Sequence, residues 1–162
     1  MKLKNKIILL LLGVFIFSAC EKDDFCTKNP ITPKLILRFY DANSILETKN
    51  VTRFSAIANS KTDSLYISVT TDSIVIPLNP FANQTIYTFK RNTMSGNMAN
   101  NEIATLTINY NLKEDFISRS CGFRIEYSDL ILSVDNGWIS SIAPETLENI
   151  NSQSTAHVQV FH

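Results

Sequence analysis

The chain has 162 residues, a length that suits one domain built around one hydrophobic core. Its 15 Lys and Arg are balanced by 15 Asp and Glu, so it lacks the excess of positive charge that neutralises a run of phosphates. This balance argues against nucleic-acid binding.

The N-terminus has the order of a secretory signal. Three lysines precede an unbroken apolar run from Ile7 to Phe17, and small residues follow. A run of eleven residues is short for a membrane-spanning helix, which needs about 20. We therefore predict that residues 1–19 are a removable signal, with an N-terminal anchor helix as the alternative. Loss of the three lysines would leave 12 Lys and Arg against 15 Asp and Glu, a mildly acidic chain.

Phe17-Ser18-Ala19-Cys20 resembles the lipobox of bacterial lipoproteins, although Phe17 stands where Leu is more usual. The resemblance implies a diacylglycerol thioether on Cys20, cleavage before it and acylation of the new amine. Three acyl chains form a stable anchor. We therefore expect a lipid-anchored outer-membrane protein that faces the periplasm or the cell surface, with residues 20–32 as its tether.

The tether begins with Glu21-Lys22-Asp23-Asp24, which resembles the export tag of surface lipoproteins of Bacteroidota. The resemblance implies transfer to the outer leaflet. An ordinary solvated tether is the alternative.

Cys26 and Cys121 remain when Cys20 carries lipid. An even pair in an oxidising compartment predicts a disulfide. It would close a loop of about 95 residues, which in the chain-entropy model gives at most about 4.7 kcal/mol of stability. The alternative is a catalytic thiol, which needs a neighbouring base or cation, and none is close in the sequence.

Period-two alternation of apolar residues predicts short strands from Pro33 onward. Pro80 should end the fourth strand, because proline cannot donate to a ladder. The strands expected in the first half are Lys34–Tyr40, Val51–Ala58, a strand with Leu65, Ile67 and Val69 on its apolar face, Ile74–Ile76, and a strand around Thr85, Tyr87 and Phe89.

The second half contains the clearest alternation, from Ala104 to Leu112, with one buried and one solvated face. A second run, from Ile117 to Tyr127, predicts one strand that places Cys121 with the apolar residues, where a disulfide would lie buried against the core. The last strand is predicted around Val158 and Val160.

Asn136-Gly137 separates the apolar runs Leu130–Val134 and Trp138–Ile142, a pattern typical of a hairpin with a type I′ turn. Pro144 followed by acids at Glu145 and Glu148 predicts one helical turn.

Eight or nine short strands without a long amphipathic helix predict an all-β fold. We expect residues 33–162 to form a single antiparallel β-sandwich. A small β-barrel is the alternative, because both architectures bury alternate residues.

Few residue patterns point to chemistry. The two histidines, His157 and His162, should face opposite sides of a strand, so we expect no metal site and no cofactor. The sequence has neither a G-x-S-x-G motif nor a glycine-rich phosphate loop, and no catalytic residue is predicted. Acids do cluster in the sequence, but such acids are more often solvated than catalytic; they are Glu114, Asp115, Glu126 and Asp129.

Asp63-Ser64-Leu65 and Asp72-Ser73-Ile74 resemble the acceptor tripeptide of O-glycosylation in exported Bacteroidota proteins. The resemblance implies Ser64 and Ser73 as acceptors.

The polar stretch from Arg91 to Asn101, with its two methionines, is interpreted either as a contact surface or as the end of a hairpin.

Together, several segments are similar to a family of uncharacterised flavobacterial (Bacteroidota) lipoproteins of unknown function. The likeness lies in the lipobox, Cys26, Lys34–Asp41, Ile76–Asn79, Cys121–Phe123 and the strand around His157. It implies the cellular address and the fold, and supplies no catalytic residues.

The expected function is that of a non-enzymatic envelope module that binds a partner protein or stabilises an assembly. One alternative is a small-molecule or glycan binder, which requires a concave apolar pocket. Another is an enzyme that uses carboxylates or tyrosine, which requires two acids converging in a cleft.

Overall fold

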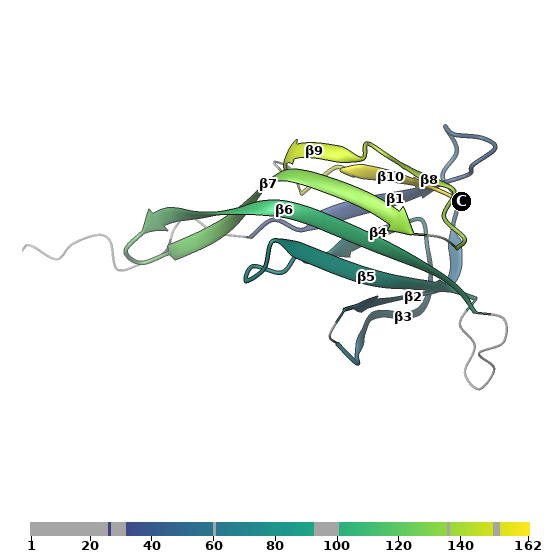
Figure 1. Cartoon of the computed structure of the whole chain (residues 1–162), viewed down its shortest axis with the longest axis horizontal. Helices are drawn as coiled ribbons and strands as arrows, with labels where there is room; N and C mark the ends of the chain where they lie inside the picture. Colours follow the sequence, from purple (N-terminus) through teal and green to yellow (C-terminus); the bar gives the residue numbers. More distant parts are fainter. Residues whose placement is uncertain (1–25, 27–31, 60, 93–100, 136, 151–152) are drawn as a thin grey trace, which may run out of the picture. The chain divides into compact units, whose positions relative to one another are not determined.

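The computed structural model describes residues 26, 32–59, 61–92, 101–135, 137–150 and 153–162 (Figure 1). The predicted signal, Cys20 and the two methionines of the Arg91–Asn101 stretch lie outside these residues. The chain forms two compact units. We call Cys26 with Phe116–Phe123 the disulfide unit, and the described parts of Ile31–Asp115 and Arg124–His162 the sandwich unit.

Within the described residues, ten strands form two sheets. The four-stranded sheet has the order β4-β1-β10-β8, from strands β1 (Leu35–Tyr40), β4 (Ser73–Ile76), β8 (Ser141–Ala143) and β10 (Val158–Phe161). The six-stranded sheet has the order β3-β2-β5-β6-β7-β9, from strands β2 (Val51–Ala58), β3 (Ser64–Thr71), β5 (Gln84–Arg91), β6 (Glu102–Ser118), β7 (Gly122–Asp135) and β9 (Thr146–Asn149). The two sheets are not closed into a barrel, so the β-sandwich prediction is confirmed.

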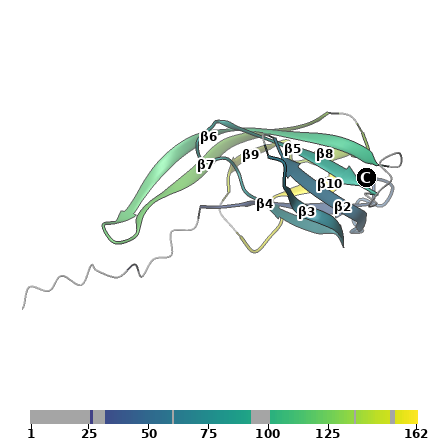
Figure 2. The same cartoon turned by 90° about the horizontal axis from the view of Figure 1, so that it is seen from below.

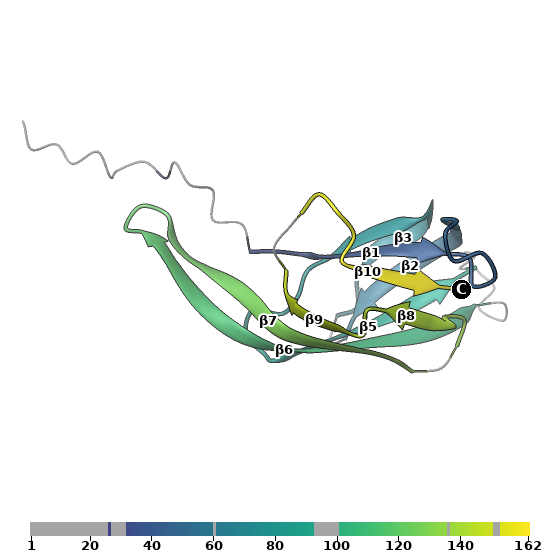
Figure 3. The same ribbon diagram turned by 90° about the horizontal axis from the view of Figure 1, so that it is seen from above.

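One pairing departs from the antiparallel prediction. β1 and β10 run parallel and side by side, with Leu37 opposite Val158 and Phe39 opposite Val160 (Figure 3). β4 and β8 pair antiparallel with their outer edges. Strands from the two ends of the domain therefore form the centre of the smaller sheet.

The core lies between the inner faces of the two sheets. Phe39 of β1 and Phe54 of β2 are both fully buried, with ring centroids 5.6 Å apart, so they join the sheets directly. Phe89 of β5 lies 5.3 Å from Phe54. Burial of one side chain of this size contributes about 1.5–3 kcal/mol to the free energy of folding. Phe39, Phe54 and Phe89 together are therefore a large part of what holds the two sheets together.

The predicted apolar face of β3 is wrong in part. Leu65 and Ile67 are exposed, whereas Tyr66 and Val69 pack against the core. β3 lies beside β2 (Figure 2). Ala56 lies opposite Tyr66 and Phe54 opposite Val69, so three steps along β3 match two along β2. This bulge carries a positive φ of 50° at Ser68 and reverses the alternation.

Two hydrogen bonds of the Tyr66 hydroxyl help to explain why this side chain points inward. Its hydroxyl accepts a hydrogen bond from the Val75 amide at 2.8 Å and donates one to the Val75 carbonyl at 3.1 Å. A side chain of the larger sheet thus satisfies the outer edge of β4 in the smaller one.

The predicted strand from Ile117 to Tyr127 contains a turn instead. β6 ends at Ser118 and β7 begins at Gly122. The Ser118 hydroxyl accepts the Cys121 amide hydrogen at 3.0 Å, and Gly122 adopts a φ of +72°. A local hydrogen bond and a left-handed glycine therefore override an apolar alternation that looked continuous.

The hairpin predicted around Asn136-Gly137 is also wrong. β7 belongs to the larger sheet, whereas β8 pairs with β10 in the smaller one, with Ile142 opposite Val160. Gly137 does have a positive φ of 108°, and Asn136 lies outside the described residues. The glycine serves a crossing between sheets rather than a two-residue turn.

The helical turn predicted from Pro144 to Glu148 is wrong as well. Residues Thr146–Asn149 form β9, and Leu147 lies opposite Leu130 of β7 and packs against the core. Burial of Leu147 and sheet pairing outweigh the local preference for a helical start.

In the described part of the chain, no helix is long and apolar enough to cross a membrane.

Candidate functional site

The loop from Pro77 to Phe81 is part of the connection from β4 to β5, and several hydrogen bonds hold it in place. Pro77 and Pro80 fix φ at two of its five positions. The Asn79 side-chain oxygen accepts the Phe81 amide hydrogen at 3.0 Å, which closes an Asx turn. The loop therefore has little local conformational freedom.

Three tyrosine hydroxyls hold this loop by hydrogen bonds to its backbone, and we call these three residues the tyrosine clamp. Each donates to one of three consecutive carbonyls: Tyr87 to Pro77 at 2.8 Å, Tyr127 to Leu78 at 3.0 Å and Tyr110 to Asn79 at 2.9 Å. The tyrosines come from β5, β7 and β6, which are neighbours in the larger sheet. The clamp therefore fixes the loop on the rigid part of the fold.

Thr85 completes a closed ring of hydrogen bonds beside the clamp. The Asn79 amide donates to the Thr85 hydroxyl oxygen at 2.8 Å, and the Thr85 and Tyr110 oxygens are 2.6 Å apart. Because the Tyr110 hydrogen points to the Asn79 carbonyl, Thr85 is the donor in the 2.6 Å bond. Such rings strengthen each member by polarisation.

The clamp hydroxyls stay protonated far above neutral pH. Burial raises the pKa of Tyr87 to about 12, and the nearby Tyr110 adds to the effect. Burial likewise raises the pKa of Tyr127 to about 12 and raises the pKa of Tyr110 above its ordinary value. All three groups are therefore dependable donors.

A pocket of about 490 Å³ lies beside the loop. Leu78, Ala58 and Ile86 contribute apolar walls, while Lys61 and Gln84 supply polar groups. The volume falls within the range of about 300–1,000 Å³ that is usual for ligand sites. Phe81 lines the pocket too, and its side chain is 94% exposed.

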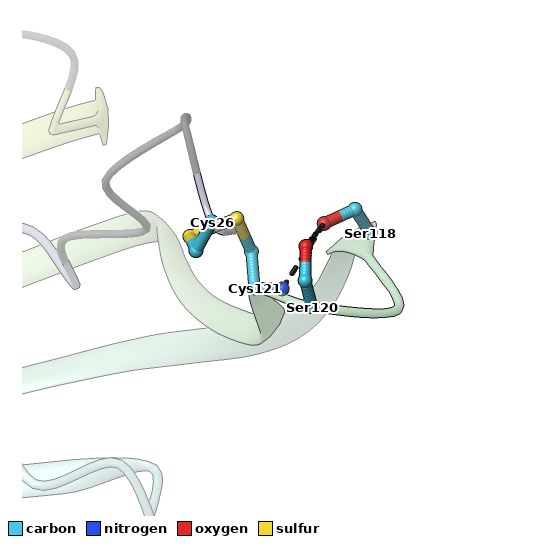
Figure 4. Close-up of a disulfide and its surroundings, with 4 residues drawn as sticks. All are labelled: Cys26, Ser118, Ser120 and Cys121. Carbon is cyan, nitrogen blue, oxygen red and sulfur yellow. Dashed lines mark hydrogen bonds between the residues drawn. A yellow bond between two sulfur atoms is a disulfide. The ribbon is translucent and has the colours of Figure 1, made fainter. Parts of the chain in front are cut away.

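The structure contains the disulfide between Cys26 and Cys121, with Cα atoms 4.8 Å apart (Figure 4). Cys26 is exposed and Cys121 half-buried. The expected burial against the core is wrong, because Cys121 belongs to the turn after β6 and not to a continuous strand. The neighbouring Ser118 and Ser120 hydroxyls lie 3.3 Å apart.

The two predicted glycosylation residues lie in different surroundings. Ser64 is the half-buried first residue of β3, an edge strand. The Ser73 hydroxyl, at the start of β4, donates to the Leu37 carbonyl at 3.3 Å. Both remain predictions.

Each of the two histidines makes a contact within the fold. The His157 Nδ1 atom accepts the Ile36 amide hydrogen at 2.9 Å. The buried His162 ring lies edge-on to Trp138, with centroids 5.4 Å apart. Within the described ranges, no three His, Cys, Asp or Glu side chains gather in a way that could hold a metal ion.

Arg124 engages two of the clustered acids. It contacts Asp115 at 2.8 Å and Glu126 at 2.6 Å. Asp129 accepts a hydrogen bond from the Asn111 amide at 3.0 Å. The arrangement is a set of half-exposed ion pairs and hydrogen bonds.

Sequence reasoning noted Pro80 only as a strand stop and missed the site around it. The two prolines and Asn79 were the available signal, since they indicate a fixed loop. The clamp tyrosines could not be assigned to it, because they lie on strands 10 to 49 residues away.

Comparison with known proteins adds a family but no activity. No curated protein and no solved structure matches the chain. Residues 51–162, which contain the loop, the clamp and the pocket, match a family of unknown function, DUF6452, and the chain belongs to that family.

Proposed function

We propose that this chain is a lipid-anchored, non-enzymatic module of the bacterial cell envelope that binds a partner protein through Phe81 and the adjoining pocket. The observation that carries the proposal is a 94% exposed aromatic ring on a loop fixed by three buried hydroxyls. Because the backbone of this loop is already fixed, the loop loses little conformational entropy on binding, so more of the area buried by the ring becomes affinity.

The surroundings of Phe81 suit a protein interface. The pocket gives an apolar floor at Leu78 and Ile86, and Lys61 and Gln84 stand at its polar positions. Protein interfaces combine an apolar centre with a polar rim in this way. The matching partner has an apolar side chain that enters the pocket and a carboxylate that faces Lys61.

A second candidate is a small-molecule or glycan binder. The pocket volume of about 490 Å³ favours it, because a protein side chain does not need so much space. In this case Phe81 stacks on the apolar face of a ring, and Gln84 and Lys61 supply the polar contacts.

The proposed location in the cell envelope rests on the sequence. The lipobox at Phe17–Cys20 supports a lipid anchor on Cys20 after removal of residues 1–19, and Glu21–Asp24 supports export to the cell surface. Labelled palmitate should enter the wild-type protein and not a Cys20→Ala variant. Protease added to intact cells should remove the domain if it faces the medium and spare it if it faces the periplasm.

The O-glycosylation proposal has its own test. Ser64 and Ser73 are proposed as acceptors, and mass spectrometry of the exported protein should show a glycan mass that falls in steps in Ser64→Ala and Ser73→Ala. An unmodified peptide at both positions would exclude the modification.

The binding site can be tested in the native envelope with a photo-crosslinking amino acid at position 81. A matched control places it at Ile131, whose side chain is also exposed, at 56%. We expect a discrete protein adduct from position 81 and none from 131. If position 81 gives no adduct, but the domain binds a glycan or metabolite and Phe81→Ala loses that binding, the second candidate holds. Failure of both experiments would contradict a binding role for this site.

A further inference from the structure

The disulfide unit carries an exposed aromatic pair. Phe116, near the end of β6, and Phe123, near the start of β7, have ring centroids 5.1 Å apart. Their side chains are 57% and 63% exposed. Two large rings that contact each other and still face solvent form an apolar surface whose burial is favourable.

The charge between the two rings is positive, whereas the flanking residues Asp115, Arg124 and Glu126 carry both signs and are ion-paired with one another. Between the two rings, the only charged residue is Arg119, which is exposed in the turn. The nearest acid before the pair, Asp115, belongs to the sandwich unit and is ion-paired with Arg124 at 2.8 Å. The segment Phe116–Phe123 therefore offers two aromatic rings and a cation, the composition of a contact with the headgroup region of a membrane.

The disulfide limits how far this pair can be from the lipid anchor. Cys121 is bonded to Cys26, which lies six positions after Cys20. A fully extended chain of that length spans about 20 Å. If Cys20 carries lipid, the turn is held within about that distance of the bilayer surface, where its effective concentration is high.

We propose that Phe116 and Phe123 insert into the headgroup region of a phosphate-bearing lipid bilayer, with Arg119 contacting lipid phosphates, as a second membrane contact beside the lipid on Cys20. The proposal rests on the lipid anchor of the proposed function. It assigns the disulfide a role: the covalent link keeps this aromatic pair close to the lipid anchor.

The test uses the full lipidated protein in vesicles of phosphatidylethanolamine and phosphatidylglycerol that contain brominated acyl chains, which quench tryptophan. The chain has a single tryptophan, Trp138, which is buried and gives the baseline. Phe123→Trp should lose fluorescence well beyond this baseline. The matched control Phe81→Trp, an exposed aromatic site in the sandwich unit, should stay at it. Thermal unfolding of both variants checks that they are folded.

Two further measurements sharpen the result. Arg119→Glu in the Phe123→Trp background should reduce the quenching, because the new charge repels lipid phosphates. Reduction of the disulfide should reduce it as well, because the turn is then no longer held near the anchor.

The outcomes separate this proposal from the anchor itself. Mass spectrometry that finds lipid on Cys20, together with quenching of Phe123→Trp no greater than that of Phe81→Trp, overturns the membrane contact and leaves the anchor intact. A Cys20 without lipid overturns the anchor, and the proximity argument with it. A cross-linked dimer that disappears in Phe116→Ala/Phe123→Ala, with quenching at baseline, would show that a second copy covers the pair instead and would also overturn the proposal.

Discussion

The hydroxyl of Tyr127 donates a hydrogen bond of 3.0 Å to the carbonyl of Leu78, a residue 49 positions earlier in the chain, and the contact is buried. It fixes a loop of the β4–β5 connection to a strand near the far side of the larger sheet. The position of Phe81, three residues after Leu78, therefore depends on the folded domain as a whole and not on its local sequence alone.

Removal of this hydroxyl should be costly. In Tyr127→Phe the ring keeps its packing, but the buried Leu78 carbonyl loses its partner. We expect the free energy of unfolding to fall by about 1–3 kcal/mol, measured by urea denaturation.

Tyr40→Phe is the matched control. The Tyr40 ring packs on Phe161, and within the described part of the chain its hydroxyl makes no hydrogen bond. A loss below about 0.5 kcal/mol is expected there. Equal losses in the two variants would mean that the clamp bond adds no specific stability.

The two positive-φ glycines should respond differently to alanine. At Gly137 an added Cβ would lie 1.9 Å from the Ile103 carbonyl oxygen, so the backbone must move. At Gly122 nothing lies within 4 Å, and only the left-handed conformation, with a φ of +72°, is unfavourable. We expect Gly122→Ala to cost about 1–2 kcal/mol, and Gly137→Ala to cost clearly more or to prevent folding. Thermal unfolding of both variants measures the difference, and a reversed order would contradict the close approach at Gly137.

Much of the fold could be predicted because alternation and burial coincide in most strands. Leu35, Leu37 and Phe39 of β1 alternate in the sequence and are all fully buried. The prediction failed where a local feature breaks the period, as the bulge at Ser68 does in β3. It failed again where pairing is decided by distant strands, since β8 joins β10 and not β7.

The candidate site was much less predictable. Pro77, Asn79 and Pro80 indicate a fixed loop, and the disulfide followed from counting cysteines. The tyrosine clamp could not be foreseen, because Tyr87, Tyr110 and Tyr127 look like ordinary alternating core residues. Their shared target is set by the order of β5, β6 and β7 in the sheet, a property of the tertiary structure.

Reduction of the disulfide should destabilise the chain through its unfolded state. Cys26 and Cys121 are 95 residues apart, so the bond removes much chain entropy from the unfolded ensemble. The loss on reduction has an upper limit of about 4.7 kcal/mol. Urea denaturation with and without reductant measures it. A Cys26→Ser/Cys121→Ser variant should match the reduced protein and ignore the reductant, and a wild type that also ignores it would contradict this contribution.

The stability that the tyrosine clamp contributes should be lost at high pH. Tyr87 and Tyr127 have pKa values of about 12 in the folded state against an ordinary value of 10.0. Between these values the folded state binds more protons than the unfolded state, so stability is complete below pH 10 and falls as the pH rises toward 12. Denaturation at pH 9 and 11 should show a smaller loss in Tyr87→Phe than in wild type. Equal losses would mean that this hydroxyl does not control alkaline unfolding.

His162 should give the opposite pH dependence near neutrality. Burial of its ring lowers its pKa below the ordinary value of 6.5, and the cations of Lys49 and Arg91 add to this effect, while the Lys49 carbonyl and Asp41 oppose it. Its buried Nδ1 atom has no hydrogen-bond partner among the described residues, so a proton there would be unsatisfied. Between the folded pKa and 6.5 the unfolded state binds more protons than the folded state. The contribution of His162 is therefore complete above pH 6.5 and is lost as the pH falls.

The variant His162→Phe separates this effect from other acid titrations. Phenylalanine can keep the edge-on contact with Trp138 but cannot take up a proton. Asp41 and Glu102 have pKa values lowered from 3.8 and 4.5, by hydrogen bonds from Asn43 and Arg91 respectively, so they act only at lower pH. Urea denaturation from pH 8 to pH 5 should show a decline in stability for wild type that is weaker in the variant. A decline of the same size in both proteins would assign the pH dependence to other groups.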